Sequence, residues 1–140
     1  MPENTVTRED LEARLNANPF AAWMGLSILR LDEDTLEIGL AWKEEMIANP
    51  EARNTHGGIL AALIDTAADF MIAAKVGRPV PTIDLRVDYH SAAGPGDLRA
   101  VARIVRLGRT FSTAEAEILD ADGKLIASGR GVYLTAAAQG

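Results

Sequence analysis

Cysteine is absent from this 140-residue chain, which excludes disulfides, thiolate metal ligands and a cysteine nucleophile. Histidine is scarce: His56 and His90 are far apart in the sequence, so no metal site is expected. No apolar run reaches the roughly 18 residues of a membrane-spanning helix, so no membrane association is expected. The first 20 residues carry four acids and no apolar segment. We therefore expect no secretory signal and a cytoplasmic protein.

Basic residues are also fewer than acidic residues. The chain has 14 Lys and Arg against 20 Asp and Glu, a formal net charge of −6. This balance argues against nucleic acid as a partner, because nucleic-acid-binding domains present a basic face. What remains is an ordinary globular composition, with 48% hydrophobic and 24% charged residues. At this length we expect a single domain over residues 1–140, with a core over about residues 20–135.

The hydrophobic pattern predicts one short helix, two strands, one long helix and then four strands. Thr7 is suited to cap the short N-terminal helix. The apolar residues in 19–24 are expected to form an apolar plug, a buried segment that leads into the first strand. A long helix is expected from about Gly57 to Val76, stopped by Gly77. Alternating apolar and polar residues predict strands over 26–31, 36–42, 82–90, 98–107, 109–119 and 124–135. Because this order is not a βαβ alternation, we predict an α+β fold with an antiparallel sheet packed on the long helix.

The predicted long helix carries its bulk on one side, which should face the sheet. The bulky side holds Leu60, Leu63, Ala67, Phe70, Met71 and Ala74. The opposite side holds Gly58, Ala61, Asp65, Asp69 and Ile72, flanked by Ala62, Ala68 and Ala73. Asp65 and Asp69 are one turn apart, a like-charge spacing that costs a helix roughly a few tenths of a kcal/mol. The second side is therefore either a solvent-exposed face or a cleft or subunit interface with one or two functional carboxylates.

The start of this helix is a second candidate element. Gly57 and Gly58 permit close approach of another backbone, and the N–H groups of a first helical turn attract negative charge. The oxyanion that develops on a thioester carbonyl is such a charge. His56 either satisfies backbone groups and shapes the loop or takes part in catalysis directly. The chain thus places an anion-attracting helix start, preceded by His56, before a carboxylate that lies nine positions after the histidine.

These motifs resemble the hot-dog thioesterase superfamily, in particular the PaaI-like branch of phenylacetate-pathway acyl-CoA thioesterases. The resemblance covers about residues 20–135, and its most specific part is 56–67. The other matching segments are 49–50, 81–89, 96–98, 105–110, 123–125 and 129–131. The resemblance implies the hot-dog fold, an antiparallel sheet wrapped around the central helix. It also implies a homodimer, or a dimer of dimers forming a homotetramer, with active sites at the subunit interface.

The resemblance implies roles for individual residues. Asp65 would be the catalytic carboxylate, acting as general base or nucleophile, and Gly57 N–H would polarise the thioester carbonyl. Asn49 would lie near the thioester or the attacking water, with Asn54 as its rival. Thr82 matches a hydroxyl position on the strand after the helix.

Further positions follow from the same resemblance. Asp69 matches a site where some relatives have a hydroxyl residue that assists the water. The CoA portion of the substrate is assigned to Gly58, Gly108 and Arg109. CoA is part of the substrate, so the resemblance implies no separate cofactor and no metal.

The expected function is hydrolysis of an acyl-CoA thioester to the free acid and CoA. One alternative is a hot-dog hydratase or dehydratase of acyl thioesters, in which a histidine works with an acid. The other is a non-catalytic module that binds acyl-CoA. The spacing of His56 and Asp65 fits the thioesterase pattern better, and the presence of both Asp65 and Gly57 argues against an inactive site. The acyl group and the choice between dimer and tetramer stay open.

Overall fold

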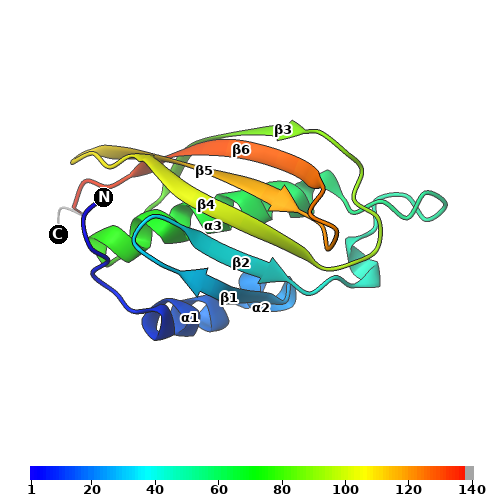
Figure 1. The fold of residues 1–140 in the computed structure, drawn as a ribbon, viewed down its shortest axis with the longest axis horizontal. Coiled ribbons are helices and arrows are strands. Elements are labelled where there is room, and N and C mark those ends of the chain that lie inside the picture. The colour runs from blue at the N-terminus through cyan, green and yellow to red at the C-terminus, as the bar shows by residue number, and fades with distance from the viewer. Residues whose placement is uncertain (138–140) are drawn as a thin grey trace.

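The computed structural model describes residues 1–137 and has an α+β architecture (Figure 1). In chain order the elements are α1 (Arg8–Ala17), α2 (Pro19–Trp23), β1 (Leu26–Leu31), β2 (Leu36–Leu40), the 3₁₀ turn η1 (Glu44–Met46), α3 (Gly57–Val76), β3 (Thr82–Tyr89), β4 (Leu98–Arg106), β5 (Phe111–Leu119) and β6 (Leu125–Leu134). All six strands form one antiparallel sheet in the order β1-β2-β4-β5-β6-β3, and α3 packs on one face of it. The predicted fold class is confirmed. No helix among these residues is both long and apolar enough to span a membrane.

Polar residues fix the turns between neighbouring strands. The side chain of Asp32 accepts hydrogen bonds from the backbone N–H groups of Asp34 and Thr35 at 2.9 and 2.8 Å. These bonds hold the β1–β2 turn and lower the pKa of Asp32 to about 2. Asp120 plays the same part between β5 and β6, where Gly123 has a φ of 82°. β3 instead reaches the far edge of the sheet and, in the described part of the chain, pairs with β6 alone, because α3 crosses the sheet before it.

The long helix α3 begins and ends where the sequence predicts. His56 is its N-cap, and His56 Nδ1 accepts a hydrogen bond from Gly58 N–H at 2.8 Å. Gly77 ends the helix in the left-handed conformation, with φ 84°, and its N–H donates to the Ala73 carbonyl at 2.8 Å. Thr7 caps α1 through a reciprocal capping box with Asp10, as predicted.

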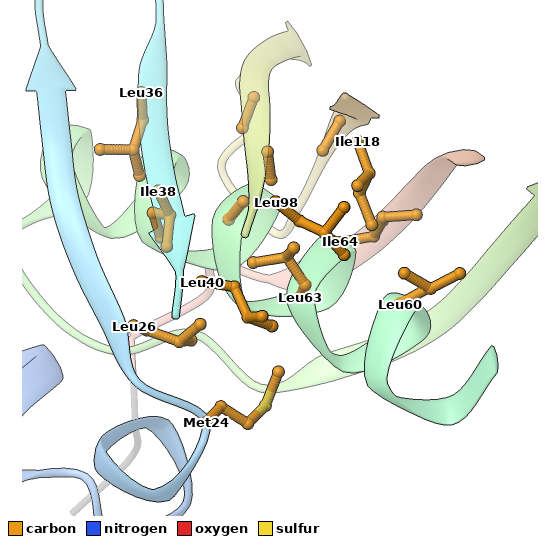
Figure 2. Close-up of a cluster of buried hydrophobic side chains, with 14 of the residues drawn as sticks. Met24, Leu26, Leu36, Ile38, Leu40, Leu60, Leu63, Ile64, Leu98 and Ile118 are labelled. Carbon is orange, nitrogen blue, oxygen red and sulfur yellow. The ribbon is translucent and has the colours of Figure 1, made fainter. Parts of the chain in front are cut away.

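The main hydrophobic core lies between α3 and the sheet (Figure 2). Figure 2 shows Leu63 and Ile64 of α3 beside Leu98 of β4 and Ile118 of β5. Further buried members are Met24, Leu26, Leu36, Ile38, Leu40 and Leu60. Burying one such side chain contributes about 1.5–3 kcal/mol. This packing fixes the rotation of α3, and with it the position of Asp65, the residue after Ile64.

The second face of α3 is covered over its C-terminal half by the same chain. Ala68 and Ile72 are fully buried in a cluster with Val80 and Tyr133. This part of the second side is therefore neither a solvent-exposed face nor open to a partner: the segment after α3 and the end of β6 cover Ala68 and Ile72, and Ala73 is also buried. The N-terminal half of this face keeps partial exposure, and it carries Gly58, Ala61, Ala62 and Asp65. Within residues 1–137, the N-terminal half is thus the part open to a ligand or a second chain.

Residues 19–24 differ from the predicted apolar plug. They form the single turn α2, in which Phe20 and Trp23 are 53% and 43% exposed. The two rings stack with their centroids 6.2 Å apart, and the Lys43 ammonium lies over Trp23 at 3.9 Å from the ring centroid. Met24 is buried. One helical turn presents only one side to the core, so its aromatic residues lie on the outer side.

Candidate active site

Asp65 is held by two hydroxyl groups from β3 and β6. Thr82 Oγ1 and the Tyr133 hydroxyl both donate to Oδ1 of Asp65, each at 2.9 Å. The two donors lie side by side because Thr82 and Tyr133 are register partners in the sheet. The other oxygen, Oδ2, accepts no hydrogen bond from residues 1–137 and keeps access to solvent. Asp65 therefore offers one oxygen to the protein and one to a water or substrate.

Two glycines of β6 make room for this arrangement. A methyl group on Gly131 would lie 2.2 Å from the Tyr133 hydroxyl oxygen, so the tyrosine can fold over this position only if no side chain is present. A methyl group on Gly129 would lie 2.6 Å from the Arg86 carbonyl oxygen and 2.9 Å from Ile64 of α3. These absent side chains let α3 and Tyr133 approach β6 closely. Tyr133 was not predicted from the sequence; the Gly129-x-Gly131 pair before it is the signal that points to it.

Asp69 lies one helical turn beyond Asp65, and burial removes much of the water around its carboxyl group. Burial raises the pKa of the Asp69 carboxyl to about 7, and the negative charge of Asp65 adds to the rise. A hydrogen bond from Val80 N–H acts in the opposite direction. The two carboxyls thus occupy contrasting environments, an arrangement suited to acid–base work. Within residues 1–137, no three His, Asp or Glu side chains lie close enough together to hold a metal ion.

Gly57 presents a free backbone donor at the positive end of α3. The N–H of Gly58 is used by His56 Nδ1, and the N–H of Ile59 donates to the His56 carbonyl at 3.0 Å. The Gly57 N–H has no acceptor among residues 1–137. Tyr89, which was not predicted, donates its hydroxyl to the Gly57 carbonyl at 2.8 Å and packs its ring against the glycine. His56 Nδ1 therefore caps the helix, and Gly57 keeps the amide that an oxyanion would need.

Gly57 and Asp65 are on one helix but are not adjacent in space. They are eight positions apart, which is about 12 Å along the helix axis at about 1.5 Å per residue. A base and an oxyanion donor that serve one carbonyl each lie about 3 Å from the reacting atom, hence at most about 6 Å from each other. A single chain therefore does not bring Asp65 and Gly57 to the same thioester.

The two candidate asparagines lie on the arm formed by residues 47–55, which projects from the sheet in Figure 1. Asn49 Oδ1 accepts hydrogen bonds from the backbone N–H groups of residues 51 and 52 at 2.8 and 3.2 Å. This oxygen is thus used in the turn at the tip of the arm. Asn54 lies at the base of the arm and lines a cavity of about 360 Å³ that Gly57 also lines. Within one chain, Asn54 is the asparagine beside Gly57.

The β4–β5 loop is fixed by two buried hydroxyls. Ser112 Oγ accepts from Gly108 N–H at 2.9 Å, and Thr135 Oγ1 donates to the Gly108 carbonyl at 2.7 Å. A methyl group on Gly108 would lie 2.1 Å from the Phe111 carbonyl oxygen, so only glycine fits. Both polar backbone groups of Gly108 are used inside the loop. The exposed guanidinium of Arg109 forms no salt bridge within residues 1–137 and is the group of this pair that an anion could contact.

Comparisons with known proteins identify the family of the chain and relatives of similar length. The profile of the family described as Thioesterase superfamily matches residues 53–127. An X-ray structure of a protein from the thioesterase superfamily is 50% identical with a TM-score of 0.89, covering 91% of this chain and 96% of that chain. A protein of Halobacterium salinarum named as an esterase is 31% identical over 134 residues, 88% of each chain. The medium/long-chain acyl-CoA thioesterase YigI of Salmonella typhimurium is 25% identical over 132 residues, 83% of this chain and 84% of that protein.

Proposed function

Because the chain belongs to the thioesterase superfamily and has its hot-dog fold, we propose that it hydrolyses acyl-CoA thioesters to the free acid and CoA. In this proposal Asp65 is the general base or nucleophile, and the Gly57 amide stabilises the oxyanion. The acyl-CoA class is supported by the relative named as a medium/long-chain acyl-CoA thioesterase. The reaction needs no cofactor, since CoA is part of the substrate and a thioester is already an activated acyl group.

The observation that carries the proposal is the state of the Asp65 carboxylate. Two hydroxyls hold Oδ1, while Oδ2 is accessible and has no partner among residues 1–137. A carboxylate fixed in this way can take a proton from water or attack the carbonyl carbon directly. The Gly57 amide, at the positive end of a 20-residue helix, offers the oxyanion a donor. The chemistry requires one carboxylate and one amide, without a serine nucleophile.

We further propose that each active site is shared between two copies of the chain. Asp65 and Gly57 lie about 12 Å apart along α3, so a second copy must supply one of the two groups. The edge strand β3 carries Thr82 and, among residues 1–137, pairs only with β6, which leaves its other edge open to a second copy. A homodimer, or a dimer of dimers, satisfies both requirements. Asn49, on the projecting arm, would then reach a partner's site instead of its own.

The proposal extends to the residue that binds CoA, the branch of the superfamily and the cellular location. Exposed Arg109 is suited to bind a phosphate of CoA, next to the tightly fixed Gly108 loop. The matched motifs at 56–67 and 81–89 favour the PaaI-like branch of the superfamily. A cysteine-free enzyme that acts on CoA esters fits a cytoplasmic location.

The decisive experiment measures release of free thiol from a panel of aryl, medium-chain and long-chain acyl-CoA esters. We expect the purified protein to hydrolyse at least one class, and Asp65→Asn to lower kcat by about 10²–10⁴-fold. Asparagine can still accept the hydrogen bonds of Thr82 and Tyr133, so the fold should persist, as a melting curve would check. Asp122→Asn, in the exposed β5–β6 turn, is the matched control and should keep full activity.

Two outcomes would contradict the proposal. Binding of CoA esters without turnover of any ester would favour a non-catalytic acyl-CoA-binding module. Full activity of Asp65→Asn would show that the catalytic carboxylate is assigned to the wrong residue, even if the protein hydrolyses thioesters.

A further inference from the structure

We propose that Tyr133 is a positioning residue for the reaction, which fixes the Asp65 carboxylate so that only Oδ2 faces the attacking water or the substrate. The inference rests on the proposed role of Asp65. It adds a residue from the last strand, 68 positions away in the chain, to a site otherwise built from α3 and the start of β3.

The contacts of the Tyr133 hydroxyl carry this inference. The hydroxyl donates to Asp65 Oδ1 at 2.9 Å and lies 3.3 Å from the backbone carbonyl oxygen of the same residue. A single phenol thus touches both the backbone and the side chain of Asp65, which restricts rotation of the carboxylate. Thr82 donates to the same Oδ1 but is itself exposed. Tyr133 is fully buried, so it is the more rigid of the two donors.

The surroundings of Tyr133 hold the phenol in one place. Its ring packs with Ala68 and Ile72 of α3, Val80 of the segment after α3 and Ala114 of β5. The hydroxyl passes over Gly131, where even a methyl group would lie 2.2 Å away. Packing on all sides leaves no other partner for this hydroxyl among residues 1–137. The cost of burying a hydroxyl is offset by its bond to a carboxylate.

The protonation state of the phenol suits a permanent donor. Burial raises the pKa of the Tyr133 hydroxyl far above its ordinary value, and the charge of Asp65, their hydrogen bond and the charge of Asp69 act in the same direction. Tyr133 therefore keeps its proton at every working pH and always donates to Asp65. Asp69 is the other titratable group that faces this pair, and it lies on α3 itself.

The test compares Tyr133→Phe with the wild type in steady-state kinetics across pH. Phenylalanine keeps the packing and removes only the donor. We expect kcat to fall roughly 10- to 100-fold with KM little changed, because misplacing a reacting group by about 1 Å costs rates of this order. We also expect the acidic limb of the kcat profile to move to higher pH, since a carboxylate that loses a donor binds its proton more tightly. Thr66→Val, which removes a hydroxyl bonded only to the Ala62 carbonyl at 2.8 Å on the same helix, should change neither quantity.

A second substitution keeps the inference testable if Tyr133→Phe does not fold. Site-specific 3-fluorotyrosine at position 133 keeps the hydroxyl and makes it a stronger donor. The acidic limb should then move to lower pH, opposite to the shift in Tyr133→Phe. Unchanged pH profiles in both proteins would overturn the inference, as would a loss of kcat in Tyr133→Phe that Thr66→Val reproduces. If Asp65→Asn is inactive while both Tyr133 variants behave as wild type, the proposed function stands and only the role of Tyr133 fails.

Discussion

At the scale of single residues, the Gly57 amide can be removed without removing the helix. Gly57 is the first residue of α3, where proline is tolerated because this N–H has no helical partner. His56 has φ −59° and ψ 133°, a conformation that a following proline accepts. In Gly57→Pro we expect kcat for acyl-CoA hydrolysis to fall about 10²–10³-fold, the usual effect of losing one oxyanion donor.

The control for this variant is Gly57→Ala, which keeps the amide. An added methyl group lies 3.3 Å from the ring of Tyr89, and this ring is 55% exposed and can shift by a fraction of an ångström. The alanine variant should therefore lose far less activity than the proline variant. Equal losses in the two variants would mean that the site depends on close approach to the glycine and not on its N–H.

Asp69 should make the stability of the protein depend on pH. Its pKa is about 7 in the folded chain against 3.8 as the ordinary value, so between these pH values the folded state binds the proton more tightly than the unfolded state. The associated stability is present below about pH 4 and is lost as the pH rises through 7. Asp69→Asn, which resembles the protonated form, should therefore gain free energy of unfolding relative to wild type at pH 8.5, on the order of 2 kcal/mol after allowance for partial exposure.

Denaturant unfolding at pH 4 and pH 8.5 tests this prediction. The difference between Asp69→Asn and wild type should be small at pH 4 and clear at pH 8.5. A difference that is the same at both pH values would show that the pKa of Asp69 is the same in the folded and unfolded protein.

Residue-scale predictions from the sequence succeed where the partners are local. His56 and Gly58 are two positions apart, and their hydrogen bond follows from ordinary helix capping. Tyr133 has no such relation to Asp65, since a strand must first be placed beside the helix before the two can meet. The resemblance to thioesterases supplied Thr82, and the structure brings it to Asp65 at 2.9 Å. The roles of these residues in catalysis stay predictions.

At the scale of elements, periodicity predicts what repeats along the chain. The bounds of α3 and the existence of all six strands follow from helical spacing, alternation and turn residues. The sequence did not predict that the C-terminal half of the second face of α3 is covered by the same chain. Small residues on a helix face pack equally well against a partner subunit or against the same chain. Val80 and Tyr133 decide that choice, and neither belongs to the pattern of the helix. The exposed aromatic pair of α2 escaped prediction because a single helical turn presents only one side to the core, and the sequence does not indicate which side that is.

At the scale of the whole molecule, the N-terminus and the middle of one helix carry different chemical groups. The Gly57 end has a free amide and the cavity that Asn54 lines, while the middle has Asp65 with its two hydroxyl donors. Neither place has both a base and an oxyanion donor. An antiparallel arrangement of two copies, related by a two-fold axis, would place the Gly57 end of each helix near Asp65 of the other and create two equivalent sites.

Mixed dimers test this shared-site arrangement directly. Co-expression of Asp65→Asn and Gly57→Pro chains with different tags, followed by two affinity steps, yields a dimer in which one site has both an intact Asp65 and an intact Gly57. We expect about half of the wild-type kcat per dimer, although kcat of each parent homodimer is at least about 100-fold below that of the wild type. The reciprocal control pairs a wild-type chain with a chain that carries both substitutions. In that dimer each shared site has one defect, so activity should be as low as in the parent homodimers. If each site were instead contained within one chain, the first mixed dimer would have this low activity and the control dimer would keep about half of the wild-type kcat.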